Sequence, residues 1–235
     1  MITIKLLTIL ALNGIPTNVA KIPLPEGYHR IELPAGSFAE WLRELPLKRD
    51  KTVYLYDGRK KSNQNVQYAV LDISTGKKDL QQCADAVMRL RAEWLKASNR
   101  FAEIVFYDNN GKAYTCPPHP SAEAYQRYLD NVFSWCGTAS LSKQLKKKQD
   151  ARKLLPGDVF IHGGFPGHAA MVMDVAVNKQ GQLIYLLMNS YMPAQDMHIV
   201  LNPTEGNLSP WYSLSESTSL EIPEWTFQLS ELKSW

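Results

Sequence analysis

The stretch GHAAMVMDVAVNKQGQLIYLLMNSY, residues 167–191, decides the fold. Two apolar runs typical of β-strands flank the polar segment 178–181, which is typical of a turn. If the runs pair antiparallel about that turn, residues whose numbers sum to about 359 face each other. Position 191 then lies opposite His168, and Asn189 is a diagonal neighbour on the same face. The sequence therefore predicts a hairpin that brings His168 and Asn189 within side-chain reach.

Other segments also alternate like strands or end in turn residues. DVFIHGG (158–164) precedes the hairpin, and the Gly- and Pro-rich loop 163–167 joins the two. The remaining strand and hairpin candidates are KTVYLYDGRK (51–60), NVQYAVLDIS (65–74), FAEIVFYDNNGKAY (101–114) and PEWTFQLSEL (223–232). Consecutive hairpins are therefore expected to build the second half of the chain.

Helical spacing of apolar residues occurs mainly in the first part of the chain. The helical segments are the region after Ser37, KKDLQQCADAVMRLRAEWLKAS (77–98), and SAEAYQRYLDNVFSWCGTASLSKQLKKKQDARK (121–153), which is broken around Cys136. We interpret the run Lys146 to Lys148 as a solvated helix face. Helices followed by antiparallel hairpins give an α+β pattern, not alternating βαβ units. We expect a Cys-bearing helix packed on an antiparallel β-sheet.

The bulk composition is that of a folded globular protein and argues against several classes of partner. With 235 residues, we expect a single α+β domain over 21–235 after an N-terminal arm or possible signal segment over 1–20. A formal net charge of +3 is too small to indicate nucleic acid or an anionic membrane. No stretch of the sequence has the length and apolarity of an integral membrane helix. We predict no cofactor.

Cys83 is the first candidate for a catalytic residue. Asp79 is a good N-cap, and Gln82 three residues later completes a capping-box pattern, which puts Cys83 at about the fourth helical position. Unpaired N–H groups in the first turn of a helix favour a thiolate and lower its pKa. A thiol nucleophile also needs an imidazole and a group that orients it, and His168 and Asn189 could supply them.

Each of these residues also has a structural interpretation. Cys83 lies on the apolar stripe of its helix, where a lone Cys is usually a small buried hydrophobe. His168 could be a hydrogen-bonded core histidine, and Asn189 could make strand-end hydrogen bonds. Cys136, at a helix break before a glycine, is a second candidate nucleophile, whereas Cys116 is expected to be a loop cysteine.

A metal site is the other chemical option. His162, His168 and either His198 or Asp158 could converge in the fold. Their spacing matches no standard ligand set, and no two cysteines form a CxxC pair. We therefore predict no metal.

The chain order of Cys83, then His168, then Asn189 followed by Ser190 and an aromatic residue resembles the papain-like cysteine peptidases and their cell-wall-cleaving relatives. The resemblance implies that His168 is the base and that Asn189 orients it. It also implies a Gln before the nucleophile that supports the oxyanion hole. Gln81 and Gln82 are the candidates for that role, although they lie closer to Cys83 than the Gln of that family does. The flanking pattern of the papain-like nucleophile is absent.

A second resemblance covers nearly the whole chain. The motifs DLQQCADAVMRLRAEWL, GDVFIHGGFPGHAAMVMDVAVN and SYMPAQDMHIVLNP are similar to those of a bacterial family labelled only as a domain of unknown function. Most of its members are predicted to be exported or envelope-associated, which implies the same setting here, with a cytoplasmic one as the alternative. The resemblance favours Cys83 over Cys136 as nucleophile. It also implies that position 189 is usually Gln, which can orient a histidine as Asn does.

These observations lead to two hypotheses. The first is a papain-like cysteine hydrolase that cleaves an amide bond of peptide or peptidoglycan type: Cys83 attacks, His168 takes and returns the proton, and Asn189 fixes the imidazole tautomer. The alternative is a catalytically inactive papain-like binding module for a peptide or glycan in the bacterial envelope. The two differ in the contact between Cys83 and His168 and in the titration of the thiol.

Overall fold

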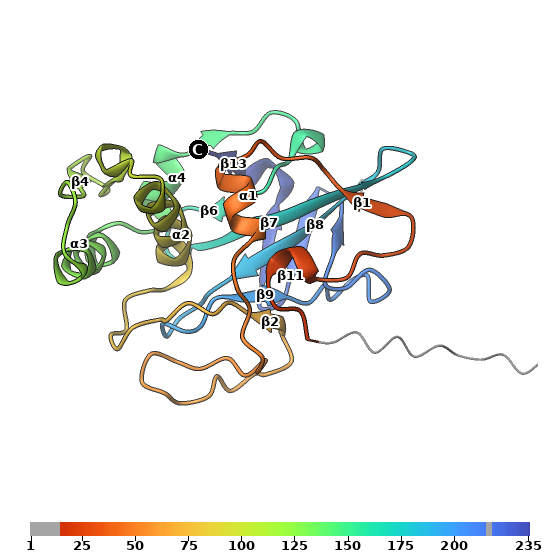
Figure 1. Ribbon diagram of the computed structural model, residues 1–235, viewed down its shortest axis with the longest axis horizontal. Coiled ribbons are helices and arrows are strands. Elements are labelled where there is room, and N and C mark those ends of the chain that lie inside the picture. Colours follow the sequence, from red (N-terminus) through yellow and green to blue (C-terminus); the bar gives the residue numbers. More distant parts are fainter. Residues whose placement is uncertain (1–14, 215–217) are drawn as a thin grey trace, which may run out of the picture.

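A computed structural model of the chain describes residues 15–214 and 218–235. Most of the N-terminal arm or signal segment expected over residues 1–20 lies outside these residues. The described chain forms a mixed α+β structure with four α-helices and one large sheet (Figure 1). None of the described helices combines the length and apolar character needed to cross a membrane.

The large sheet has nine strands, and every recorded pairing in it is antiparallel. The strand order is β2-β9-β8-β7-β6-β13-β5, with β1 paired to β7 and β10 paired to β8. The strands are β1 (Tyr28–Arg30), β2 (Gln67–Val70), β5 (Lys146–Lys147), β6 (Val159–His162), β7 (His168–Asn178), β8 (Leu183–Asn189), β9 (His198–Val200), β10 (Tyr212–Ser213) and β13 (Leu232–Ser234). The long strands β7 and β8 lie at its centre, as expected of the stretch that is most apolar on both faces.

The β7–β8 hairpin forms, and it has the predicted register only at the end away from the turn. Asn178 and Gln182 close the turn through a backbone hydrogen bond of 3.1 Å, and the pair Met171 with Met188 has the expected register. At this end of the hairpin Asn189 therefore projects from the same face as His168. Between Val172 and Asp174 the register shifts by one residue. This β-bulge turns Asp174 to the opposite face from His168, so the two side chains do not point together.

The helices and the two small hairpins surround this sheet. They are α1 (Phe38–Arg43), α2 (Cys83–Ala97), α3 (Ala122–Trp135), α4 (Thr138–Gln144), the hairpin β3 (Val105–Tyr107) with β4 (Ala113–Thr115), and the hairpin β11 (Ser219–Ile222) with β12 (Trp225–Gln228). Short 3-10 helices are η1 (Val19–Lys21), η2 (Phe101–Glu103), η3 (Ala151–Lys153) and η4 (Leu229–Glu231). The Ser37 hydroxyl accepts from the Glu40 N–H and starts α1, as its sequence predicts.

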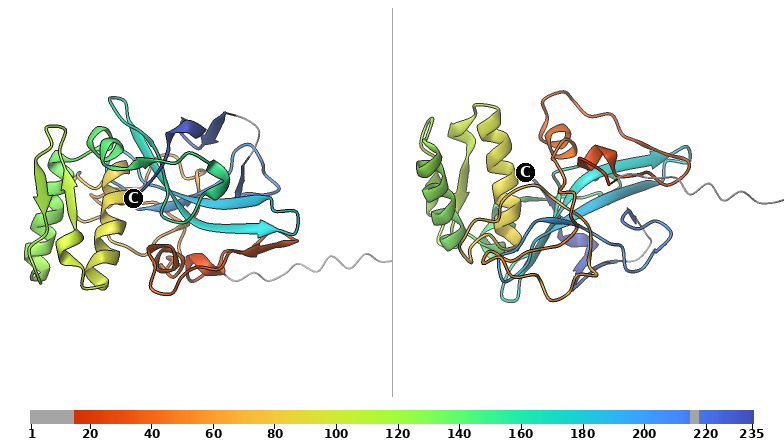
Figure 2. Two further views of the ribbon diagram at one scale, coloured as in Figure 1. Left: turned by 90° about the horizontal axis from the view of Figure 1, so that it is seen from above. Right: turned by 60° about the horizontal axis from the view of Figure 1, so that its bottom comes forward.

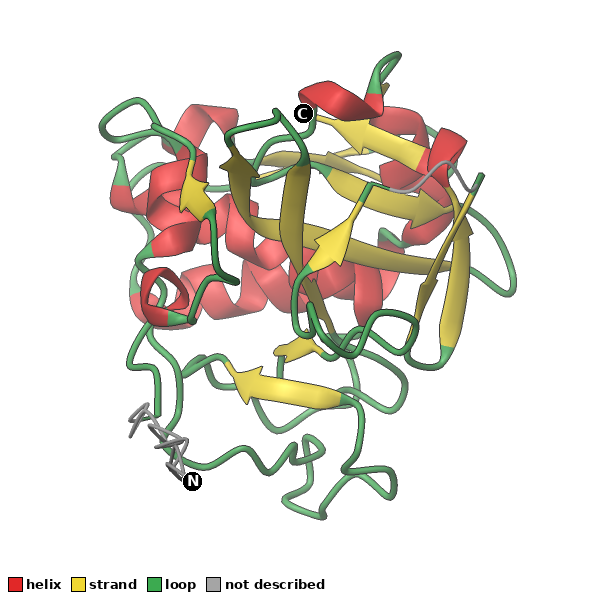
Figure 3. Ribbon diagram, turned by 90° about the vertical axis from the view of Figure 1, so that its right-hand side faces the viewer, coloured by secondary structure: helices red, strands yellow, loops and turns green. Residues whose placement is uncertain are grey.

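The sheet separates two apolar clusters. The larger one joins helices α1 to α4 to the face that carries Met171, Met173 and Met188. The smaller one lies under the β11–β12 hairpin and includes Phe160, Val172 and other residues of the opposite face. Figure 2 (left) shows α1 and the β11–β12 hairpin on opposite sides of β7 and β8, with α2, α3 and the β3–β4 hairpin stacked beyond one end of the sheet. Figure 3 shows the helices gathered behind the strands.

The helix α2 packs against β7, so the expected Cys-bearing helix does lie on an antiparallel sheet. Its apolar stripe of Val87, Leu90 and Trp94 is buried as predicted. The start of the helix differs, because the N-cap is Gln82 and not Asp79. The Asp79 carboxylate instead accepts from the Ala194 N–H at 2.7 Å. Cys83 is therefore the first residue of the helix.

Two sequence predictions about local structure are wrong. Segment 51–60 contributes only the isolated bridges of Tyr54 and Leu55 and is not a strand. Two of its backbone N–H groups donate to side chains and not to another strand: the Tyr54 N–H donates to Asp196, and the Val53 N–H donates to Gln64. The run Lys146 to Lys148 is not a helix face either, because its first two residues form β5 at the edge of the sheet.

Candidate active site

One cavity of about 320 Å³ brings together Cys83 and His168, two of the three predicted catalytic residues, whereas Asn189 is not among its lining residues. It lies where the first turn of α2, the junction of α3 and α4, the loop 163–167 and the start of β7 meet. Cys83 and His168 both line it, so two residues 85 positions apart in sequence share one wall. Cys136, the second candidate nucleophile, lines the same cavity.

Cys83 is held at the cavity by backbone amides. The N–H groups of Ala84, of Cys83 itself and of Ala169, the residue after His168, lie against the thiol and favour a thiolate. Burial is the larger effect, and together with the Asp85 carboxyl it raises the pKa of the Cys83 thiol to about 11. The expected lowering of this pKa is therefore not found. Among the described residues no hydrogen bond joins the Cys83 thiol to the His168 ring.

His168 is buried in an aromatic cage. Its ring centroid lies 4.7 Å from that of Tyr191, 5.1 Å from that of Trp225 and 5.8 Å from that of Phe227. Burial lowers the pKa of His168 to about 4, against a contribution from the neighbouring Asn189 side chain that raises it. The imidazole is therefore neutral at pH 7, as a general base must be before it takes a proton.

Behind His168 a row of buried polar residues crosses three adjacent strands. Asn189 on β8 lies beside the His168 ring, and His198 on β9 is the cross-strand partner of Asn189. His198 donates from Nδ1 to the carbonyl of Asp196 at 2.9 Å. Within the described chain, His168 Nε2, both polar atoms of the Asn189 side chain and His198 Nε2 are buried without hydrogen-bond partners. We call His168, Asn189 and His198 the polar row.

The two glutamines expected to support an oxyanion lie in different places. Gln82 lines the cavity, and its side-chain amide donates to Asp79 at 3.2 Å. Gln81 is buried behind the helix start, where its side-chain carbonyl accepts from Arg89. Only Gln82 is therefore placed to touch a ligand in the cavity.

Asp85 is a cavity residue that the sequence interpretation missed. Its Oδ2 accepts from the Gln82 N–H at 3.0 Å, and its Oδ1 is buried without a partner among the described residues. Burial raises the pKa of this carboxyl well above its usual range, which favours its uncharged form. Its position in the first turn of α2 could have indicated this role. The sequence prediction placed the N-cap at Asp79, which put Asp85 beyond the first turn.

The other two cysteines are less suited to be nucleophiles. Burial, with Asp108 and Asp85, raises the pKa of Cys136 to about 12. Burial also raises the pKa of Cys116, which follows β4. All three cysteines are free thiols. Cys83 alone lies at a helix start that also faces a histidine-bearing strand.

The alternative metal site does not form in the described part of the chain. No group of three His, Cys, Asp or Glu side chains in residues 15–214 and 218–235 is arranged to hold a metal ion. His162 pairs with Glu231, and Asp158, which the sequence suggested as a turn residue, is buried and pairs with Lys148. Neither joins His168 and His198.

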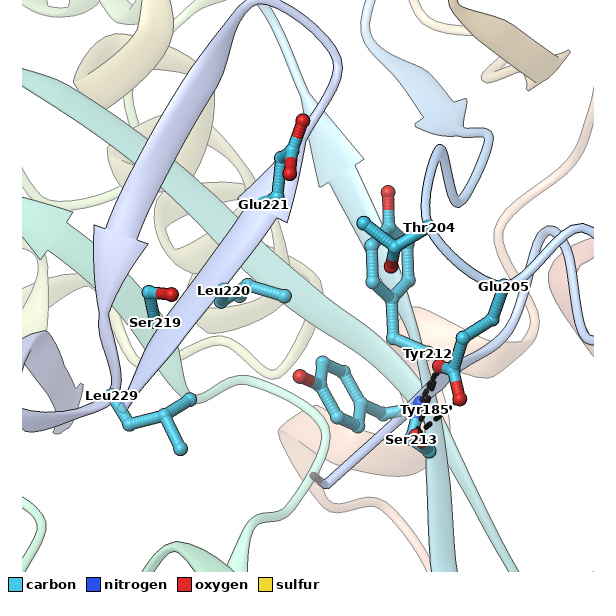
Figure 4. Close-up of a pocket in the computed structure, with 9 residues that line it drawn as sticks. All are labelled: Tyr185, Thr204, Glu205, Tyr212, Ser213, Ser219, Leu220, Glu221 and Leu229. Atoms are coloured by element: carbon cyan, nitrogen blue, oxygen red, sulfur yellow. Dashed lines mark hydrogen bonds between the residues drawn. The ribbon is translucent and has the colours of Figure 1, made fainter. Parts of the chain in front are cut away.

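A second cavity of about 310 Å³ lies between the β11–β12 hairpin and the segment Thr204 to Ser213. Figure 4 shows Glu205 hydrogen-bonded to Ser213 at its wall, beside Tyr185 and Tyr212. Its lining residues include no thiol and no imidazole. The thiol and histidine chemistry of the described chain is therefore concentrated in the first cavity.

Comparison with known proteins supplies a family without an assigned activity. The family model described as "Domain of unknown function (4846)" matches residues 19–118 and 113–234. No curated protein and no solved structure matches the chain. The match agrees with the resemblance to a family of unknown function.

Proposed function

The chain belongs to the family described as domain of unknown function (4846), and we propose that it is a cysteine hydrolase of papain-like architecture that cleaves an amide bond. The observation that carries the proposal is the shared cavity of Cys83, at the first residue of α2, and His168, at the first residue of β7. The substrate is of peptide or peptidoglycan type, and an exported or envelope-associated setting is part of the proposal. No cofactor takes part in it.

The reaction proceeds by acyl transfer to sulfur. The Cys83 sulfur attacks the substrate carbonyl while its proton passes to His168, and a C–S bond forms. His168 then returns the proton to the leaving amine as the C–N bond breaks. Water, activated by His168, hydrolyses the thioester and frees the acid. The N–H groups of Cys83 and Ala84 at the helix start stabilise the oxyanion, with Gln82 beside them.

Proton transfer accompanies attack in this proposal and does not precede it. With a thiol pKa of about 11 and an imidazole pKa of about 4, both groups are neutral near pH 7. A resting thiolate–imidazolium pair is then a minor species. His168 acts as a general base on a neutral thiol, which contributes about 100-fold or more to the rate.

The polar row gives His168 the tautomer that this role requires. A carbonyl can only accept, so the Asp196 carbonyl places the His198 proton on Nδ1 and leaves Nε2 as an acceptor. We infer that the Asn189 side chain, whose polar atoms have no hydrogen-bond partner in the described chain, orients its NH₂ toward His198 and its oxygen toward His168. His168 accordingly carries its proton on Nε2 and keeps the lone pair of Nδ1 for the thiol. His198 is a positioning residue in this scheme.

A second candidate function is a papain-like binding module without activity, for a peptide or glycan. The high pKa of Cys83 and the missing hydrogen bond between Cys83 and His168 favour it. The two candidates predict different reactions of the same thiol.

Acylation by p-nitrophenyl acetate tests the proposal directly. A hydrolase should release a burst of one p-nitrophenolate per protein at pH 7.5, with the acetyl group on Cys83 in peptide mass spectra. Cys83→Ala should abolish the burst, and His168→Ala should slow it about 100-fold. Acetylation of lysines alone, or Cys83 acetylation that is as fast in His168→Ala, would establish the binding module instead. Cys116→Ser is the matched control, since Cys116 does not line the cavity.

A further inference from the structure

The cavity around Cys83 is lined by few groups that can carry a charge. Its 20 lining residues include no Lys, Arg or Glu. Its ionisable groups are Asp85, His168, Cys83, Cys136 and Tyr191, and burial is the main cause that moves each of their pKa values in the direction that favours the uncharged form. A substrate that places a carboxylate or an ammonium group here would lose its hydration without gaining a counter-charge, which is costly.

The rim of the same cavity is apolar and exposed. Six large hydrophobic side chains of the described chain are exposed, and three of them line this cavity: Trp135 at 63 %, Phe165 at 97 % and Met192 at 62 % exposed. They come from three separate segments, the end of α3, the loop 163–167 and the loop after β8. Convergence of such side chains on one opening marks a binding surface, whereas single exposed hydrophobes need no explanation.

The interior of the cavity continues this character. Phe133, Tyr191 and Trp225 line it together with small residues such as Ala84 and Gly137. A volume of about 320 Å³ is at the lower end of the range for small-molecule sites, enough for one bulky side chain and the atoms next to it.

Resting on the proposed hydrolase function, we propose that the substrate carries an uncharged aromatic or large aliphatic group next to the scissile carbonyl. Trp135, Phe165 and Met192 hold this group and determine specificity. Acyl groups that bear a carboxylate or an ammonium at that position are rejected. Of the two substrate types, this favours an apolar site within a peptide over a peptidoglycan stem bond flanked by charged groups.

A series of p-nitrophenyl esters that differ only in the acyl group tests this inference. In each, the Cys83 sulfur bonds to the acyl carbon, p-nitrophenolate leaves, and the thiol proton passes through His168 to solvent. Relative to acetate, we expect hydrocinnamate to acylate Cys83 at least about 10-fold faster and the anionic hemisuccinate at least about 10-fold slower, because one buried apolar group or one unpaired charge changes transition-state binding by about that factor or more. Equal rates, or a faster hemisuccinate, would overturn it.

Variants of the rim locate the effect. Phe165→Ala, Met192→Ala and Trp135→Ala should each lower the ratio of hydrocinnamate to acetate rates toward one. Leu155→Ala removes an exposed hydrophobe outside the cavity and should leave the ratio unchanged. A ratio that moves equally in Leu155→Ala would also contradict the inference. Failure of the proposed function looks different, because then no ester acylates Cys83 in a manner that depends on His168.

Discussion

Two buried polar clusters lie on the same strand, and they are built in opposite ways. Asp174, in the middle of β7, is fully buried. Its carboxylate accepts hydrogen bonds from Arg30 Nε at 2.6 Å, from Arg43 Nε at 2.8 Å and from the Val175 N–H at 2.9 Å. The polar row at the start of β7 is equally buried, yet four of its polar atoms have no partner in the described chain. We call the first the saturated cluster, because both oxygens of the Asp174 carboxylate accept hydrogen bonds, and the second the open cluster.

On the proposed function, the difference separates a structural site from a site of chemistry. A buried carboxylate held by two guanidinium groups tolerates substitution poorly, because removing any partner leaves a buried charge without its counter-charge. Unpartnered buried polar atoms cost stability and persist where something else requires them. Position in the fold agrees with this division, since Asp174 faces α1 and β1, whereas the polar row ends at the cavity of Cys83.

The largest expected effect is on the saturated cluster. Asp174→Ala should lower the free energy of unfolding by about 3–5 kcal/mol, because it leaves two partly buried arginines without their counter-charge. Urea unfolding monitored by circular dichroism measures it. Asp57→Ala is the matched control, since its pair with Arg59 is exposed and its loss should change the free energy of unfolding far less. If both variants lost a similar free energy of unfolding, burial of the Asp174 ion pairs would add nothing to their contribution.

The second expected effect concerns the pH dependence of stability through His198. Burial lowers the pKa of His198 from 6.5 to about 4, so the folded state binds a proton less readily than the unfolded chain. The contribution of His198 to the free energy of unfolding is therefore complete above pH 6.5 and is lost as the pH falls toward 4. Between pH 7.5 and 4.5 this amounts to about 2–3 kcal/mol.

His198→Gln should remove that loss, because Gln does not titrate and its amide can still donate to the Asp196 carbonyl. The measured quantity is the difference between the unfolding free energies at pH 7.5 and pH 4.5, in the wild type and in the variant. The exposed His29 supplies the control His29→Gln, which should leave the difference unchanged. A wild-type slope retained in His198→Gln would mean that His198 is not held neutral by burial.

The hairpin could be predicted because its signals are local, whereas the shared cavity of Cys83 and His168 could be expected only from a chain order that resembles the papain-like peptidases. Turn residues at 178–181 and two apolar runs predict the antiparallel pairing. Next to the turn the register differs by one residue from the prediction, since Val177 pairs with Leu183. Only beyond the bulge do pairs such as Met171 with Met188 have the predicted register, which restores the common face of His168 and Asn189. The bulge at Met173 could not be predicted in this way, because Asp174 is clamped by Arg30 and Arg43, more than 100 residues earlier in the chain.

The unpredicted parts of the site depend on contacts between distant segments. His198 joins the polar row only through its pairing with Asn189 across β8 and β9, which follows an irregular loop. The residues of segment 51–60 alternate as in a strand. Two of its N–H groups, however, donate to the side chains of Gln64 and Asp196 and not to a neighbouring strand. The raised pKa of Cys83 depends on how deeply the helix start is buried. The periodicity of the sequence does not predict that depth.

The smallest expected effect on stability is the most informative about the open cluster. Asn189→Leu removes two unpartnered polar atoms and keeps a similar volume, so the free energy of unfolding should stay constant or rise by about 1 kcal/mol. Acylation of Cys83 should nevertheless slow at least about 10-fold, since His168 loses the group that selects its tautomer.

Asn202 is the matched control, because it is a buried asparagine whose hydrogen bonds are made. Its Nδ2 donates to the Trp211 carbonyl at 2.9 Å, and its Oδ1 accepts from the Thr204 N–H at 3.0 Å. Asn202→Leu should therefore cost about 2 kcal/mol or more by leaving buried partners unpaired, with no effect on acylation. If Asn189→Leu were as costly as Asn202→Leu, ordered water would already satisfy the polar row. The two clusters on β7 would then differ in what satisfies them and not in whether they are satisfied, and stability would no longer distinguish the reactive end of the strand from its structural middle.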